Sequence, residues 1–417
     1  MRRIAGFLLF VFAFAIPWEF SFDLGEPLGN AARIAGILVL LAGVPAIFQA
    51  GRMRSPGVFC WIVLALFLWF CLTWLWTIDA TATFEKLRAY FQEMMIVWLV
   101  WEFADTPADL RALLRATVAG SWVLALLTLA AFRSPEAIAA GQIRFAAYGQ
   151  DPNDVARFLV LGFPLAALLV RCERRWPLRL MAVGFLPLGI AAVLLTASRS
   201  GFLAALVALA GSLILLAYGR ARRVAAAAAL ALPVFLAALW FMVPAETVYR
   251  LATIPEQLSG GDLNQRVNIW SAGWRAFAHS PLIGSGAGTF VAASRVAAIN
   301  SAHNTALSVV VGGGLIALFL ASLLVVLAVH AALQCRGLLR MALAMCLLVW
   351  VITSLTATVE ESRTTWLLFS VAVLAARVSQ EDPLGVAACF RPAPPRPSRA
   401  PHRNDLSSEI LKIRLSP

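Results

Sequence analysis

The chain has 417 residues, of which 61% are hydrophobic and only 13% are charged. No ordinary soluble domain of this size is so apolar, so the composition excludes that class and predicts a polytopic membrane protein. The formal net charge of +12 does not indicate nucleic-acid binding, because most basic residues fall in short loops between apolar runs.

Twelve apolar runs approach the roughly 20 residues that cross a hydrocarbon layer as a helix. They lie near residues 4–20, 32–48, 57–76, 89–104, 116–132, 154–170, 180–197, 201–218, 224–243, 305–330, 341–358 and 364–378. We expect the first run to be a span and not a signal peptide, because no small-residue cleavage site with a soluble domain follows it. The predicted fold class is therefore all-α, a transmembrane bundle with spans 1–9 in residues 1–243 and spans 10–12 in residues 305–378.

Loop charges predict the orientation, because positively charged loops stay on the cytoplasmic side. One side of a twelve-span bundle receives both termini and most basic loop residues, among them Arg52, Arg111, Arg174 and Arg336. We therefore expect a multi-pass protein of the bacterial inner membrane with both termini in the cytoplasm and the loop 244–304 in the periplasm. Residues 379–417 are rich in proline and poor in apolar residues, which predicts a disordered cytoplasmic tail, either solvated or in contact with anionic lipid.

A second set of basic residues falls on the outer side, against this bias. Its members are Arg33, Lys86, Arg88, Arg133, Arg144, Arg157, Arg199, Arg250, Arg266, Arg275, Arg295 and Arg363. Several are next to span ends, where a buried charge is costly unless an anion compensates it. An anionic ligand on the outer side is therefore expected.

Arg199 lies in a short polar break between two spans, in the string LLTASRSGFLAAL. A guanidinium at that place can form paired hydrogen bonds with phosphate oxygens. The structural alternative is an interfacial arginine that pairs with lipid headgroups.

Helical periodicity separates two arginines of the outer loop. From 264 to 279 the residues Val267, Trp270, Trp274 and Phe277 recur at spacings of three and four and predict a stripe that packs on the membrane domain. At about 100° per residue, Arg266 lies beside Trp270 and Arg275 lies on the opposite face. Arg266 is therefore expected to face inward and Arg275 to face water.

His303 precedes the tenth span and is a candidate general base, because a neutral imidazole can accept a proton from a sugar hydroxyl. The adjacent Asn304 can orient a ring or a substrate, although a lone interfacial histidine also serves structural roles. No metal-ligand motif is present, so no metal site is predicted. The string Gly284, Gly286 and Gly288 lacks the ending of a phosphate-binding loop and is interpreted as a flexible turn that brings the loop back to the membrane.

Four strings occur in order on the outer side: RFAAYGQDPNDVA, LLTASRSG, NQRVNIW with PLIGSGAGTF downstream, and AHNTALSVVVGGGLI. With this set, residues 140–320 resemble the O-antigen ligase and O-antigen polymerase superfamily of bacterial polysaccharide assembly. The resemblance implies a membrane glycosyltransferase of the GT-C type that takes a glycan from undecaprenyl diphosphate. A ligase transfers it to a sugar of the lipid A core, and a polymerase to another lipid-linked repeat.

The resemblance also implies residue roles. Residues matching Arg199 and Arg266 bind the diphosphate in this family, and the one matching His303 activates the acceptor hydroxyl. Family members often have a glutamate where this chain has Gly312 and a glycine where it has Ala317. Asp151 or Asp154 are candidates to supply the missing carboxylate, and the DPND string is similar to exopolysaccharide-type members.

The expected mechanism is a metal-independent, inverting displacement without a cofactor. Arg199 and Arg266 compensate the negative charge of the departing diphosphate, with Arg144 or Arg157 as supporting cations, and His303 acts as the base. Asn153, Asn304 and Trp270 are further expected substrate-binding residues. The expected partners are the lipid-linked donor, the lipid A-core or glycan acceptor and membrane lipids. The alternatives to the ligase are a polymerase and, in another class, a transporter, which would show polar or Gly/Pro-broken spans at the bilayer midplane. Gly312–Gly314 is the one such break that stands out, and it lies near the outer end of its span.

Overall fold

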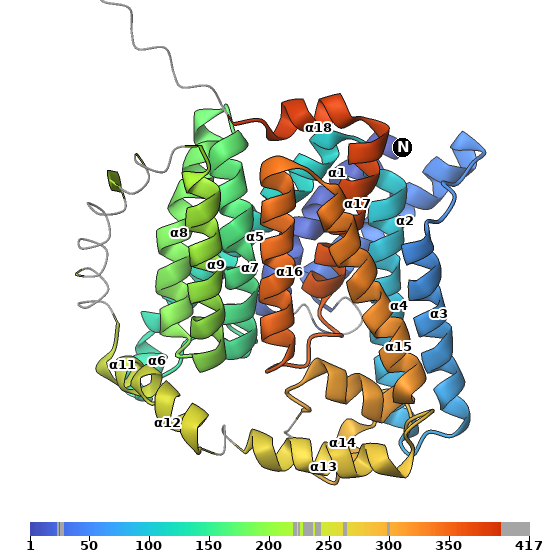
Figure 1. Cartoon of the computed structure of the whole chain (residues 1–417), viewed down its shortest axis with the longest axis vertical. Coiled ribbons are helices and arrows are strands. Elements are labelled where there is room, and N and C mark those ends of the chain that lie inside the picture. The colour runs from blue at the N-terminus through green and yellow to red at the C-terminus, as the bar shows by residue number, and fades with distance from the viewer. Residues whose placement is uncertain are drawn as a thin grey trace, which may run out of the picture.

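A computed structural model describes residues 1–22, 25, 29–219, 223, 226–227, 237, 243–261, 265–297 and 301–392. Within these ranges the protein consists of helices and connecting loops and has no β-strand (Figure 1). The predicted all-α transmembrane fold is therefore confirmed.

The described part of the chain has nine helices that are long and apolar enough to cross a membrane. They are α1 (Arg2–Ala15) with η1 (Ile16–Ser21), α2 (Ala31–Ala50), α3 (Val58–Leu72) with η2 (Thr73–Leu75), α5 (Pro107–Phe132), α7 (Pro152–Cys172), α8 (Trp176–Leu195), α9 (Arg199–Ala217), α15 (Thr305–Gln334) and α16 (Gly337–Ser354). The more polar helices α4 (Ala80–Phe103) and α17 (Arg363–Glu381) cover two further predicted spans. The predicted span 224–243 falls almost entirely outside the described residues.

Polar side chains begin several of these helices, and α4 and α5 start nine residues before the apolar runs predicted at 89–104 and 116–132. Asn30, Asp79 and Asp151 each accept a hydrogen bond from a backbone N–H in the first turn of the helix that follows. Thr106 and Asp109 form a reciprocal capping box at the start of α5. Each such bond satisfies an amide that would otherwise have no partner at the helix end.

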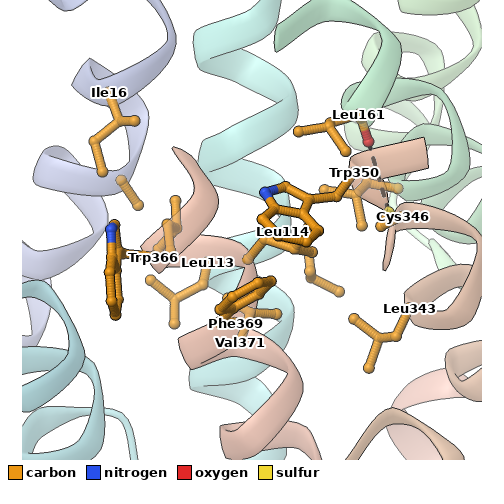
Figure 2. Packing of buried hydrophobic residues seen from close by; sticks show 14 of the residues in the cluster. Ile16, Leu113, Leu114, Leu161, Leu343, Cys346, Trp350, Trp366, Phe369 and Val371 are labelled. Carbon is orange, nitrogen blue, oxygen red and sulfur yellow. Dashed lines mark hydrogen bonds between the residues drawn. The ribbon is translucent and has the colours of Figure 1, made fainter. Parts of the chain in front are cut away.

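Helix α7 is the central element of the bundle. Every residue from Val155 to Cys172 is buried, and α7 packs against α5, α8, α9 and α16. In the neighbouring part of the core, Trp350, Phe369 and Trp366 lie close together (Figure 2). The indole N–H of Trp350 donates to Thr365 Oγ1 over 2.9 Å, so the buried donor is satisfied.

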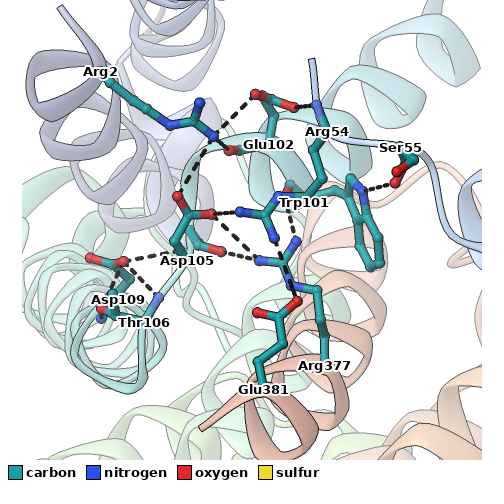
Figure 3. Close-up of polar contacts among 11 residues, drawn as sticks. Arg2, Arg54, Ser55, Trp101, Glu102, Asp105, Thr106, Asp109, Arg377 and Glu381 are labelled. Atoms are coloured by element: carbon teal, nitrogen blue, oxygen red, sulfur yellow. Dashed lines mark hydrogen bonds and ion pairs between the residues drawn. The ribbon is translucent and has the colours of Figure 1, made fainter. Parts of the chain in front are cut away.

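An ion-pair network holds one end of the bundle together (Figure 3). The fully buried Glu102 accepts from Arg2 Nη2 over 3.1 Å and from the backbone N–H of Arg54 over 2.9 Å. Asp105 pairs with Arg54 and, over 3.8 Å, with Arg377. These contacts link α1, α4 and α17, and all the charges have partners within the protein.

The predicted tail begins too early at residue 379. Helix α17 continues to Glu381, and α18 (Pro383–Phe390) packs against α5, α7 and α17. Val386 and Phe390 are buried, and the guanidinium of Arg111 lies 5.6 Å from the Phe390 ring centre. These apolar anchors order residues that the overall composition of the tail assigned to disorder, and residues 393–417 lie outside the described part.

The short helices of the long loop all lie at the end of the bundle opposite the N-terminus and α18 (Figure 1). They are α11 (Ala245–Ala252), α12 (Ile254–Ser259), α13 (Arg266–His279) and α14 (Phe290–Ser294), and α6 (Pro135–Ala139) joins them. We call this the loop end. The two described chain ends thus lie on one side of the bundle and the long loop on the other.

The packing face of α13 differs from the predicted stripe. Val267 and Trp274 are 45% and 58% exposed, whereas Ile269, Ala272, Gly273 and Ala276 are buried. The reason is close approach: a Cβ at Gly273 would lie 2.8 Å from side-chain atoms of Leu307 and Phe290. Small residues therefore face α15, and two of the bulky residues turn away.

Candidate functional site

The first part of the site is the tight connection between α8 and α9. Ala197 has a φ of +48°, and Ser198 then begins α9, with its hydroxyl accepting from the N–H of Gly201. Arg199 is the first residue of α9, so its side chain starts at the loop end. The hydroxyl of Ser198 also donates to Asn153 Oδ1 over 2.9 Å, which ties this turn to the start of α7.

Arg144 joins the same polar group from the loop before α7. Its Nη2 donates to Asn153 Oδ1 over 2.9 Å and its Nε donates to the carbonyl of Thr196 over 3.2 Å. Asn153 therefore connects Arg144 to the turn that carries Arg199, two predicted site residues far apart in sequence.

Arg250 is a site residue that the sequence did not single out. Arg199 Nε donates to the carbonyl of Arg250 over 3.1 Å, and Arg250 Nε donates to the carbonyl of Ala197 over 3.1 Å. Arg199 Nη2 also donates to Thr253 Oγ1 over 2.6 Å. Helix α11 is thus fixed to the start of α9, and the only signal in the sequence was the position of Arg250 on the outer side.

A cavity of about 140 Å³ opens between α9, α12 and α13, and we call it the cation cavity. Arg199, Arg250 and Arg266 line it together with Asn153, Ser200, Leu203, Ile254, Gln257, Trp270 and Thr356. None of these described lining residues has a carboxylate. A wider hollow of about 510 Å³ adjoins it, shares Arg199 and Arg250 and includes Glu246 and Tyr249.

Arg266 occupies the position that its helix predicted. It is the first residue of α13 and is half-buried, whereas Arg275 on the opposite face is exposed. Burial lowers the pKa of Arg266, with the positive charge of Arg144 acting in the same direction and Asp151 opposing both. Burial likewise lowers the pKa of Arg250, and the charges of Arg144 and Arg199 lower it further. Enclosed cations that repel one another favour an anion between them.

His303 lies beside this group but does not line the cation cavity. Its φ is +45°, and its Nδ1 is 3.3 Å from Ser301 Oγ. Burial lowers the pKa of His303, and the charge of Arg266 lowers it further, while Asp151 and Asp154 oppose the shift. The imidazole is therefore neutral near pH 7, which is the form that can accept a proton.

Trp270 positions the segment that carries His303. Its indole N–H donates to the carbonyl of Ala302 over 3.0 Å, while its side chain lines the cation cavity. The described chain has four non-glycine residues with positive φ, and three of them are at or near these site residues. Ala197 lies two residues before Arg199, Gln265 lies directly before Arg266, and the third is His303 itself. Such conformations cost about 1–3 kcal/mol and persist where the surroundings enforce them, commonly at functional sites.

Two predicted site residues have structural partners instead. Asn304 begins α15 by accepting from the N–H of Leu307, and its Nδ2 donates to the carbonyl of Leu355 over 3.3 Å. Arg157 is buried in α7 and forms an ion pair with Asp154 over 3.1 Å. Neither residue lines the cation cavity. In the described ranges no three His, Cys, Asp or Glu side chains form a group that could hold a metal.

The glycine string forms turns that bring the loop back to the membrane domain, and its backbone is hydrogen-bonded to α15. The N–H groups of Ser285 and Gly286 donate to the carbonyls of Val311 and Gly312, both over 2.9 Å. These bonds are possible because α15 breaks at Gly314, whose φ of +68° and ψ of −167° only glycine adopts easily. The predicted break near the outer end of this span is therefore present, and it anchors the loop.

Sequence comparison supports the resemblance. Residues 183–322 match the family model described as O-antigen ligase. This segment contains most of α8, all of α9, helices α11 to α14 and the first part of α15, and therefore Arg199, Arg250, Arg266 and His303. No curated protein matches the chain significantly. The protein is thus a polytopic helical membrane protein, and the match to the O-antigen ligase family model over residues 183–322 supports the predicted resemblance.

Proposed function

We propose that this protein is an O-antigen ligase-like glycosyltransferase of the bacterial inner membrane, with its site at the periplasmic face. Its donor is a glycan on undecaprenyl diphosphate, and its acceptor is a sugar of the lipid A core. The observation that carries the proposal is the convergence of Arg199, Arg250 and Arg266 on a cavity whose described lining residues include no carboxylate, beside a neutral histidine.

The cation cavity binds the diphosphate of the donor. Arg199 and Arg266 compensate the negative charge that grows on the diphosphate as its bond to the anomeric carbon breaks, and Arg250 adds a third cation. Arg144 supports them through Asn153. Arg157 contributes less than the sequence suggested, because Asp154 already balances its charge.

His303 takes the proton of the acceptor hydroxyl. Its Nδ1 lies 3.3 Å from Ser301 Oγ, and in the tautomer that donates from Nδ1 to this hydroxyl, Nε2 is the basic nitrogen. The acceptor oxygen forms a bond to the anomeric carbon while the bond from that carbon to the diphosphate oxygen breaks, and the diphosphate keeps the electron pair. One displacement of this kind inverts the anomeric configuration, and it uses neither a metal nor a nucleotide.

Purified protein, incubated with a synthetic undecaprenyl-diphosphate glycan and lipid A-core in the presence of EDTA, tests this function. We expect a glycan-extended lipid A-core with inverted anomeric configuration. Longer lipid-linked glycans instead would identify a polymerase. No transfer to either acceptor, with intact donor moved across vesicle membranes, would reject the enzyme in favour of a transporter.

A further inference from the structure

A second polar cavity lies at the loop end, between η1, α2, α4 and the start of α17, and has a volume of about 370 Å³. We call it the mixed-charge cavity. Ligand sites commonly have volumes of about 300–1,000 Å³. Arg33, Arg88 and Arg363, three of the outer arginines that topology did not explain, line it, so the cation cavity does not account for them.

The mixed-charge cavity is lined by charged groups of both signs. Against its three arginines stand four carboxylates, those of Glu19, Glu85, Glu93 and Glu361. Arg363 pairs with Glu19, and Lys86 from α4 bonds both Glu361 and, over 3.1 Å, Glu360. A diphosphate therefore gains little here, in contrast to the cation cavity.

Glu93 indicates that the cavity takes a ligand that donates hydrogen bonds. It is only 1% exposed, it lines the cavity, and its Oε2 has no hydrogen-bond partner among the described residues. It lies 13 residues into α4, roughly 20 Å from the loop end at 1.5 Å per residue. A carboxylate at such a depth in a membrane protein is costly and marks a functional site.

The other lining groups match a sugar. The hydroxyl groups of a saccharide donate to carboxylates and accept from guanidinium and amide N–H groups, all of which are present. Phe20 adds an aromatic ring that is 49% exposed and can cover the C–H face of a sugar ring.

The loop between α16 and α17 connects the two cavities. Thr356 lines the cation cavity and Glu361 lines the mixed-charge cavity. Five residues span at most about 18 Å even when fully extended, so the cavities are close. The hydroxyl of Thr305, two residues after His303, donates to the carbonyl of Ala357 over 2.8 Å and accepts from the N–H of Val359 over 3.0 Å. A short oligosaccharide held in one cavity can therefore reach the base beside the other.

From this juxtaposition we infer that the mixed-charge cavity is a saccharide subsite that holds the acceptor glycan. The inference rests on the proposed function only in identifying the saccharide as the acceptor. The binding of a neutral saccharide to this cavity does not depend on that function. Because α4 presents Glu85, Arg88, Ala89, Gln92 and Glu93 on one face of the helix, a bulky residue at position 89 fills the cavity.

The test uses purified full-length protein and the dephosphorylated core oligosaccharide released from lipopolysaccharide, with binding measured by calorimetry. We expect the oligosaccharide to bind to wild type and to lose at least about tenfold in affinity for Ala89→Trp. The control Ala80→Trp should keep wild-type affinity, because Ala80 is exposed on the opposite face of α4. Arg88→Ala changes an exposed side chain and should also weaken binding. Arg266→Gln should bind the oligosaccharide normally, because its side chain lies in the other cavity.

Transfer assays separate this inference from the proposed function. If wild type transfers glycan but Ala89→Trp and Arg88→Ala leave the acceptor KM unchanged, the subsite is refuted and the enzyme stands. If wild type transfers nothing but binds the oligosaccharide in an Ala89→Trp-sensitive way, the saccharide site stands and the enzyme does not. Equal oligosaccharide binding by wild type and both variants overturns the inference outright.

Discussion

Replacing Arg266 by alanine is the most direct test of the cation cavity, because the same helix provides a matched control. Two unit charges about 4 Å apart interact by about 4 kcal/mol at the effective dielectric of about 20 that suits a half-buried pair. Arg199 and Arg250 remain and retain part of the compensation. We therefore expect Arg266→Ala to raise the transfer barrier by about 3 kcal/mol, or roughly a hundredfold in kcat/KM.

The assay compares kcat/KM for the lipid-linked donor in purified Arg266→Ala, Arg266→Lys and Arg275→Ala. Arg275 is exposed on the opposite face of α13, so Arg275→Ala should transfer glycan at the wild-type rate. Lysine keeps the charge but loses the paired geometry of the guanidinium, which predicts an intermediate loss. If Arg266→Ala stays within about threefold of Arg275→Ala at equal folded amounts, Arg266 does not meet the developing charge and the reasoning fails.

Three further predictions concern the base, its pKa and the topology. His303→Gln should keep donor binding but lose transfer by about 10²-fold to 10⁴-fold, because an amide forms hydrogen bonds but is a very poor base; near-normal turnover would exclude the base role. Asp151→Asn preserves the helix cap, since asparagine caps as well as aspartate, but removes a charge that raises the pKa of His303. The acid limb of the rate profile, expected below the ordinary histidine pKa of 6.5, should therefore move to lower pH, and a shift to higher pH would contradict the assignment. A periplasm-specific reporter should be active when fused near Gly261 and silent when fused near Arg174, and the reverse pattern would move the site to the cytoplasm.

The sequence predicted most of the bundle because an apolar run that must satisfy its own backbone in lipid has no alternative to a helix. It also separated Arg266 from Arg275, since helical periodicity relates residues on one element. It misassigned Val267 and Trp274, because periodicity finds a stripe but does not say whether large or small residues meet the neighbour, and close contact at Gly273 selected the small ones. In the same way, the average composition of residues 379–417 predicted disorder for the whole segment, although Phe390 is buried near its start.

Arg250 could not be predicted, and the reason concerns how the site is assembled. Two hydrogen bonds join it to the start of α9 through main-chain carbonyls: Arg250 Nε donates to the carbonyl of Ala197, and the carbonyl of Arg250 accepts from Arg199 Nε. Bonds to main-chain atoms leave no mark on the sequence, because every residue has a carbonyl. The described residues that line the cation cavity include no carboxylate, whereas Arg363 in the mixed-charge cavity pairs with Glu19. A lining of guanidinium and neutral polar groups suits an anionic ligand, and a lining of paired opposite charges suits a neutral one. That difference in partners supports assigning the diphosphate to one cavity and the saccharide to the other.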